Sequence, residues 1–232
     1  MRKTFLMIFL ITLFAVPCWA ADTEINISVE KGEDTEAAQA IAKVALAEQL
    51  AALGREQNSP MYLASAAQIL SSIGTFEEVT REKTEEGDKA EGTKAPASVE
   101  NTPESLYAEA INAAKAQGDD ALVAVIENQS RLGGSRGRVG GSGVNRTRVY
   151  QRDYYDVRFV AGRRAAVSVS GDGDDLELYV YDSNGNLVAS DAQGYRTYRS
   201  ISWTPRWTGT FRIWVINPSD SVPYVDYRLT TN

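Results

Sequence analysis

The sequence contains no histidine, and its single cysteine is Cys18. Histidine is the usual general base near neutral pH and the commonest zinc ligand. Its absence removes serine–histidine and cysteine–histidine nucleophilic sites. Catalysis would have to use carboxylates, a lysine-activated serine or a metal held by oxygen atoms. We therefore expect a protein that is not an enzyme.

The first 20 residues have the pattern of a secretory signal peptide. Arg2 and Lys3 form a basic start, an apolar run extends from Phe5 to Val16, and Cys18-Trp19-Ala20 followed by Ala21 offers a small-residue cleavage site. We expect cleavage after Ala20 and a periplasmic or secreted protein. The apolar run is shorter than the roughly 20 residues of a membrane-spanning helix, so we expect no membrane span after cleavage.

Cys18 offers an alternative, a lipoprotein with an acylated cysteine as its first residue. Pro17 stands where a lipobox has a small residue, which disfavours this alternative. With cleavage after Ala20, the mature chain has no cysteine and must be stabilised without disulfides.

Charge is divided unevenly along the chain. Residues 21–130 contain 8 Lys+Arg and 21 Asp+Glu, whereas residues 131–232 contain 14 Arg and 10 Asp+Glu. Such a split indicates two regions with different surfaces. Two interpretations stay open for the arginine-rich half: ordinary solvation, or contact with an anionic envelope or glycan surface.

The first of these regions, residues 34–130, has the pattern of alanine-rich helical hairpins. Ser59-Pro60 and Thr102-Pro103 each combine a capping side chain with a proline suited to a first helical turn. Between the hairpins, residues 75–101 are highly charged and poor in apolar side chains, which predicts a flexible acidic loop. Small alanine faces bury little area, so we expect these helices to need a neighbour.

Residues 131–146 interleave glycine with arginine, which predicts a flexible linker. In a cytoplasmic protein this composition would suggest nucleic-acid contact, but we expect no nucleic acid as the partner of an exported chain. From residue 147 to 232, short alternating segments are separated by turn residues every 8–12 positions, as in an antiparallel β-sandwich. The predicted fold class is therefore α+β in two parts, helical hairpins followed by a jelly-roll-like sandwich.

The sandwich segment also resembles a known family. The stretches that carry the resemblance are Phe159-Val160-Ala161-Gly162, Val167-Ser168-Val169-Ser170-Gly171-Asp172-Gly173, Asp175-Leu176-Glu177-Leu178-Tyr179-Val180-Tyr181-Asp182, Asn184-Gly185-Asn186 and Trp203-Thr204-Pro205-Arg206-Trp207-Thr208-Gly209. In this order they resemble the bacterial pre-peptidase C-terminal domain, over residues 146–232. The resemblance does not extend to the N-terminal half. It implies a non-catalytic β-sandwich of secreted proteins, associated with secretion, maturation or binding of polymeric substrates, with calcium bound in some members.

An acidic loop provides candidate calcium ligands. Carboxylates and loop carbonyls supply the oxygen atoms that calcium requires. The candidates are Asp172, Asp174 and Asp175, with Asp182 and Asp191 joining if the following hairpin folds back. The alternative is that aspartate and glycine simply make turns at strand ends. No other cofactor is expected.

Aromatic side chains are the candidates for a ligand surface: Trp203, Trp207, Trp214 and Tyr198. Exposed aromatic rings on a sandwich can stack on sugars or on polymer chains, and the alternative is that they pack as structure. The sequence thus predicts an exported, non-catalytic binding or accessory protein whose partner is an envelope protein or a glycan or polymer surface. Two alternatives remain, a scaffold that binds a partner protein through its helices and an accessory module or remnant of a secreted hydrolase.

Overall fold

The computed structural model describes residues 24–85, 101–131, 138–172, 175–219 and 224–232. The helices in these residues are α1 (Glu36–Glu56), α2 (Pro60–Ser71), α3 (Pro103–Ala116) and α4 (Asp120–Ser130). The strands are β1 (Thr75–Glu78), β2 (Lys83–Glu85), β3 (Arg138–Arg148), β4 (Arg152–Phe159), β5 (Ala165–Gly171), β6 (Glu177–Tyr181), β7 (Leu187–Asp191), β8 (Tyr198–Trp203), β9 (Gly209–Ile216) and β10 (Tyr224–Thr231). No helix in this part of the chain combines the length and hydropathy that a membrane span requires.

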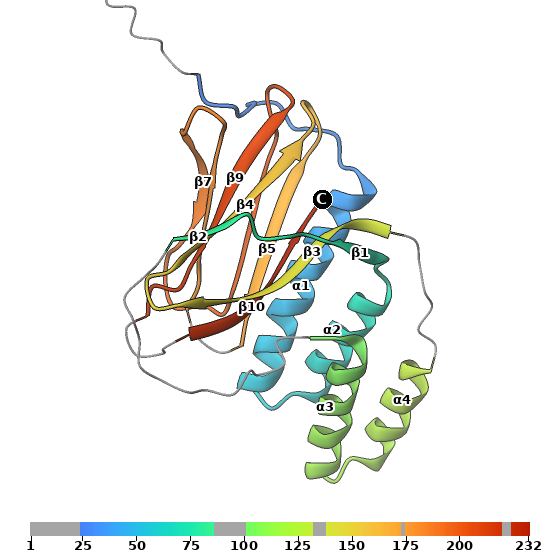
Figure 1. Ribbon diagram of the computed structural model, residues 1–232. Helices are drawn as coiled ribbons and strands as arrows, with labels where there is room; N and C mark the ends of the chain where they lie inside the picture. The colour runs from blue at the N-terminus through green and yellow to red at the C-terminus, as the bar shows by residue number, and fades with distance from the viewer. Residues whose placement is uncertain (1–23, 86–100, 132–137, 173–174, 220–223) are drawn as a thin grey trace, which may run out of the picture.

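The strands form two sheets that face each other across one apolar core (Figure 1). The first sheet has the order β1-β3-β10-β5-β8 and the second β2-β4-β9-β6-β7. Neighbouring strands run antiparallel except for β1 and β3. The two-part α+β fold expected from the sequence is confirmed.

Alternation along the strands decides which side chains enter the core. On β9, Phe211, Ile213 and Val215 are fully buried between the sheets. Arg212 and Trp214 lie between them in sequence and therefore point to the outer face. The same two-residue period on the other strands gives each sheet one apolar and one solvent-facing or helix-facing side.

The helices begin where their capping residues predict. The Ser59 side chain accepts a hydrogen bond from the Tyr62 amide at the start of α2. Thr102 and Ser105 exchange backbone and side-chain hydrogen bonds at the start of α3, forming a capping box. The buried faces of these helices are dominated by alanine, which allows close packing.

Helix α1 joins the helical layer to the sandwich (Figure 1). One side of it contacts β5, β8, β10 and β3 on the outer face of the first sheet, and another side packs against α2. Ala38, Ile41 and Ala47 are completely buried on this helix. The alanine-rich helices therefore have their neighbour within the chain.

The linker predicted for residues 131–146 is wrong over residues 138–146, which form most of β3. This strand pairs with β10 from Gly141 to Arg148 and with β1 over its first residues, up to Ser142. Its glycines allow the neighbouring backbones to come close: a Cβ on Gly140 would overlap the Thr231 carbonyl oxygen, and one on Gly143 the Val79 carbonyl oxygen. Residues 132–137 lie outside the described residues.

The acidic loop predicted for residues 75–101 is wrong over residues 75–85. Strand β1 pairs with β3 in the first sheet, and β2 pairs with β4 in the second, so this segment crosses from one sheet to the other. Between the two strands, Arg81 donates to the buried carboxylate of Asp153 at 3.0 Å. Residues 86–100 of the predicted loop lie outside the described residues.

Candidate binding surfaces

Two of the predicted calcium ligands surround an arginine. Arg199 is completely buried, and its guanidinium group lies 2.6 Å from Oδ1 of Asp175 and 3.2 Å from Oδ1 of Asp191. The other oxygen of Asp191 accepts a hydrogen bond from the Ser200 amide. The positive charge beside these two carboxylates is therefore supplied by the chain itself.

Asp182 lies far from that pair. It follows β6 whereas Asp175 precedes it, which puts the two roughly 20 Å apart along the strand. Its carboxylate accepts hydrogen bonds from the amides of Asn26, Asn184 and Asn186. Burial alone would raise the pKa of Asp182, but these amide donors outweigh burial and lower it.

The remaining two acidic candidates have different outcomes. Asp172 accepts a hydrogen bond from the Asp226 amide, beside the β10 strand. Asp174 lies outside the described residues. Within the described part of the chain, no three acidic, histidine or cysteine side chains gather as a metal-binding group. The structure thus brings Asp175 and Asp191 together on Arg199 and places Asp182 at the other end of β6.

The candidate aromatic residues lie in four different places. Trp203 is 5 % exposed and packs in the core against Phe159 and Phe211, so it forms no ligand surface. The backbone of Trp207 exchanges two hydrogen bonds with the buried side chain of Asn26. Tyr198 lies at the start of the edge strand β8 and is half-buried. Trp214 lies on the outer face of the second sheet.

The surroundings of Trp214 form an ordered surface across the second sheet. Tyr154 and Tyr179 are its register partners on the two neighbouring strands. We call Tyr154, Trp214 and Tyr179 the aromatic row. No helix of the described chain packs closely on this face, because α1, which joins the helices to the sandwich, lies on the outer face of the first sheet (Figure 1).

Charged side chains flank the aromatic row on both sides. One flanking row contains Glu85, Arg152, Ile216 and Glu177, and the other contains Asp156, Arg212, Tyr181 and Leu187. The rings of Tyr154 and Tyr181 contact Trp214 at centroid distances of 5.2 and 4.6 Å. The guanidinium group of Arg152 lies 5.4 Å from the Trp214 ring centre.

Burial, helped by the flanking carboxylates, raises the pKa of both tyrosines of the row. Burial raises the pKa of Tyr179 to about 12, and its hydroxyl donates to Glu177 at 2.9 Å. Burial likewise raises the pKa of Tyr154 to about 12, with Glu85 as the next cause. Both phenols therefore stay neutral hydrogen-bonding groups over the physiological pH range.

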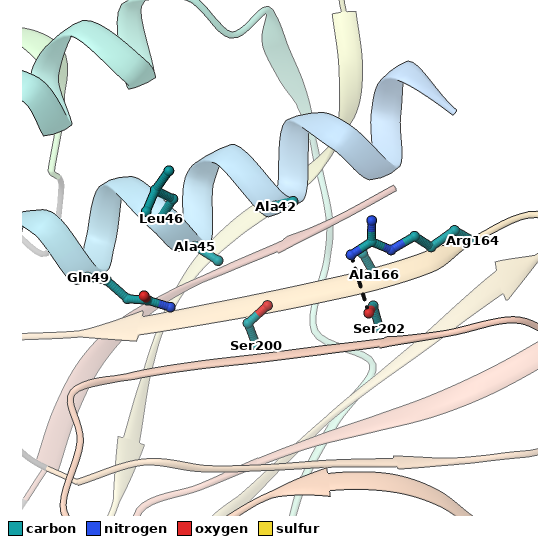
Figure 2. Close-up of a pocket in the computed structure, with 8 residues that line it drawn as sticks. All are labelled: Ala42, Ala45, Leu46, Gln49, Arg164, Ala166, Ser200 and Ser202. Carbon is teal, nitrogen blue, oxygen red and sulfur yellow. Dashed lines mark hydrogen bonds between the residues drawn. The ribbon is translucent and has the colours of Figure 1, made fainter. Parts of the chain in front are cut away.

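A second surface is the groove between α1 and the first sheet, with a volume of about 270 Å³ (Figure 2). The residues that line it are Ala42, Ala45, Leu46, Gln49, Arg164, Ala166, Ser200 and Ser202. Arg164 donates to Asp34 at 3.0 Å and lies 3.5 Å from the Ser202 hydroxyl. None of the lining side chains is a carboxylate, so the groove itself supplies no general acid–base pair.

A third, larger groove of about 640 Å³ lies among the helices. Its apolar lining comes from α2 and α3 and the residues next to them: Leu70, Ile73, Pro103, Tyr107, Ala108 and Ile111. Ser71, Thr75, Glu104 and Ser130 add polar groups at its margin. This groove is suited to an apolar side chain or helix face of a partner.

No protein-family model matches the chain, and no curated protein matches its sequence. Among solved structures, the pre-peptidase C-terminal domain of a Bacillus anthracis collagenase is similar over 38% of this chain and 87% of its own, with 14% identity and a TM-score of 0.29. The g-type lysozyme inhibitor PliG of Aeromonas hydrophila is similar over 39% of this chain and 82% of its own, with 14% identity and a TM-score of 0.29. The C-terminal CBM6 of the Zobellia galactanivorans laminarinase LamC covers 36% of this chain and 74% of its own, with 13% identity and a TM-score of 0.24. At these values none of the likenesses identifies a ligand or an activity for this chain.

Sequence reasoning found Trp214 but missed the rest of the surface around it. Tyr154, Tyr179, Arg152 and Arg212 each alternate with core residues in the sequence, which places them on an outer face. Which of them lie opposite one another depends on strand order and register. Those pairings join segments up to about 60 residues apart, and the alternation within one strand does not reveal them.

Proposed function

We propose that this protein is an exported, non-catalytic binding protein, and that the outer face of the second sheet is its binding surface. The observation that carries the proposal is the aromatic row in register across three strands, flanked by charged rows and not covered by the helical layer. Within the row, Trp214 and Tyr179 are half-buried, whereas Tyr154 is 5% exposed and packs against the edge of Trp214. Half-buried aromatic rings with guanidinium groups beside them are typical of recognition surfaces. Their ordering across a rigid sheet provides a preorganised surface.

Co-sedimentation with insoluble cell-envelope material tests this function. The purified full chain is expected to sediment with the envelope fraction, and Trp214→Ala is expected to reduce the bound fraction about tenfold. Tyr195→Ala is the matched control, because Tyr195 is 68% exposed and lies outside the three rows. Equal sedimentation of wild type and Trp214→Ala would reject the outer face as the binding surface.

A second candidate function is a scaffold whose helices bind a partner protein. The groove of about 640 Å³ between α2 and α3 favours it, together with Met61 and Tyr62, which are 52% and 39% exposed on the same helical layer. Ile111→Glu would place a charge in the groove. Loss of envelope binding in that variant, with Trp214→Ala unaffected, would favour the scaffold.

Calcium stabilisation stays a separate prediction, and it concerns Asp172 and Asp174 most directly because Asp175 and Asp191 already form ion pairs with Arg199, and Asp191 also with Arg196. A thermal melt with calcium and with chelator tests it. A ligand at a hundredfold excess over its Kd stabilises the folded state by about 2.7 kcal/mol. A rise in Tm of several degrees that Asp172→Ala abolishes would establish the site, and an unchanged Tm would leave these residues as turn formers.

A further inference from the structure

The groove of about 640 Å³ among the helices is lined by a single charged side chain, that of Glu104. Every other lining residue is apolar or carries only a neutral hydroxyl: Leu70, Ser71, Ile73, Thr75, Pro103, Tyr107, Ala108, Ile111 and Ser130. Glu104 is exposed, and it forms no ion pair with any other residue that the structure describes. Its carboxylate is therefore available to a cation that enters the groove.

Two helix ends make the margin of this groove more negative. α2 ends at Ser71 and α4 at Ser130, both of which line the groove, and neither helix has a basic residue in its last turn. The carbonyl groups at a helix C-terminus carry a partial negative charge that favours cations. Arg131 follows α4 as an exposed C-cap but does not line the groove. The groove thus combines an apolar lining with a margin that attracts positive charge.

The lining also suits a helix. Ala108 is an exposed small residue of α3, so another helix can approach the wall closely at that point. Ile111, on the same helix, and Leu70, on α2, are half-buried and offer apolar contacts. A bound helix satisfies its own backbone hydrogen bonds and needs only such contacts, made by its side chains at i, i+3 or i+4 and i+7.

We propose that this groove binds a basic amphipathic helix of a partner protein, with apolar side chains against Leu70 and Ile111 and a lysine or arginine near Glu104. This inference rests on the second candidate function, since it names the partner of the same groove. A second copy of the chain fits the groove less well. Residues 34–75 and 101–131 contain 9 Asp+Glu against 4 Lys+Arg, so two helical layers would bring like charges together.

Fluorescence anisotropy with three labelled peptides of about 18 residues, long enough to form a helix alone, tests the partner. The first peptide has leucines at helical spacing and lysines elsewhere. The second has glutamates in place of the lysines, and the third has the composition of the first in an order that forms no apolar stripe. The full chain is expected to bind the first peptide and to bind the other two about tenfold more weakly.

Two variants locate the binding in the groove. Ala108→Phe fills the groove from an exposed position and is expected to weaken binding of the first peptide about tenfold. Its control is Ala121→Phe, at an exposed position of α4 that does not line the groove. Glu104→Gln is expected to weaken binding about threefold, the size of an exposed charge contact, and Glu36→Gln, at an exposed position of α1, to leave it unchanged.

Other outcomes overturn the inference in distinguishable ways. Equal binding of the first and third peptides, or equal binding by wild type and Ala108→Phe, would reduce the interaction to non-specific charge. Tighter binding of the glutamate peptide would overturn the basic partner. No binding of any peptide, with envelope sedimentation that Ile111→Glu abolishes, would overturn the basic helix and leave the scaffold function to another partner. No binding and unchanged sedimentation of Ile111→Glu would overturn both.

Discussion

At the scale of single residues, the sandwich contains a buried polar network at one end of its core. Asp153 is completely buried, and its carboxylate accepts hydrogen bonds from Arg81, Gln151 and the Tyr227 hydroxyl. The hydroxyls of Tyr155 and Tyr227 lie 2.7 Å apart. Burial raises the pKa of Tyr155 to about 12 and that of Tyr227 well above its usual value. Each of these polar groups tolerates burial because its neighbours satisfy it.

Replacing Arg81 by alanine is expected to lower the free energy of unfolding by about 3 kcal/mol, because it leaves the Asp153 charge buried without its cation. Urea unfolding measures the change. Arg163→Ala is the control: it removes an exposed pair with Glu33 at 3.4 Å and should cost at most about 1 kcal/mol. Similar losses in both variants would contradict the role given to Arg81.

Glu48 gives a prediction about pH. It is 4% exposed on α1, and burial raises its pKa above the usual 4.5 although Asn101, Arg228, Ser170 and Arg55 all favour its charged form. The stabilisation that its protonated form provides is complete below pH 4.5 and is lost as pH rises through the raised, folded-state pKa.

Glutamine reproduces the protonated form at every pH. Glu48→Gln is therefore expected to match the wild type in stability at pH well below 4.5 and to exceed it at neutral pH. Urea unfolding at the two pH values measures this difference. Glu36→Gln, which removes an exposed charge from the same helix, is the control. If the difference in stability between Glu48→Gln and wild type does not change with pH, burial does not raise the pKa of Glu48.

At the scale of elements, local signals predicted the helices and most strands, and pairing decided the rest. The caps at Ser59 and Thr102 act within three residues, so the sequence reveals them directly. The segment with Gly140, Gly141 and Gly143 looks like a linker, because a glycine-rich composition is compatible both with a flexible segment and with a tightly packed strand. Only the positions of β1 and β10 on either side of β3 distinguish the two. For the candidate site, Trp214 was visible in the sequence, but its cross-strand partners were not.

Gly143→Ala tests whether β3 needs its glycines. The added methyl group would overlap the Val79 carbonyl oxygen, and overpacking of this kind costs about 1–3 kcal/mol. We expect a lower Tm in a thermal melt, whereas Val144→Ala, at a neighbouring side chain that is 55% exposed, should change it little. An unchanged Tm for Gly143→Ala would mean that this region of the strand is loosely held.

At the scale of the whole molecule, α1 makes the two parts interdependent. The sandwich core and the helical core are separate clusters of buried residues. Helix α1 contributes Ala47 and Ala51 to the helical core and contacts the first sheet along its other side. Because one helix serves both parts, neither keeps its buried surface covered when the other unfolds.

We therefore expect a single unfolding transition for the full chain. Trp19 precedes the expected cleavage site, and the other three tryptophans, Trp203, Trp207 and Trp214, all belong to the sandwich. In a chain that begins at Ala21, tryptophan fluorescence therefore reports the sandwich, while far-ultraviolet helical ellipticity reports the helical part. Coincident midpoints by the two probes are the expected result. Two separated midpoints would show that the contact of α1 with the sheet is too weak to couple the unfolding of the helical part to that of the sandwich.

The position of β10 has a consequence for the order of folding. Among the described strands this one comes last in sequence order, yet it lies at the centre of the first sheet, between β3 and β5. A chain that emerges N-terminus first can complete neither the sheet nor the seat of α1 until Tyr224–Thr231 has emerged. Contacts so distant in sequence also make folding slow. Until that strand is present, β3 and β5 lack the hydrogen-bonding partner that they share, and removing it would leave the sheet divided into two halves, β1-β3 and β5-β8.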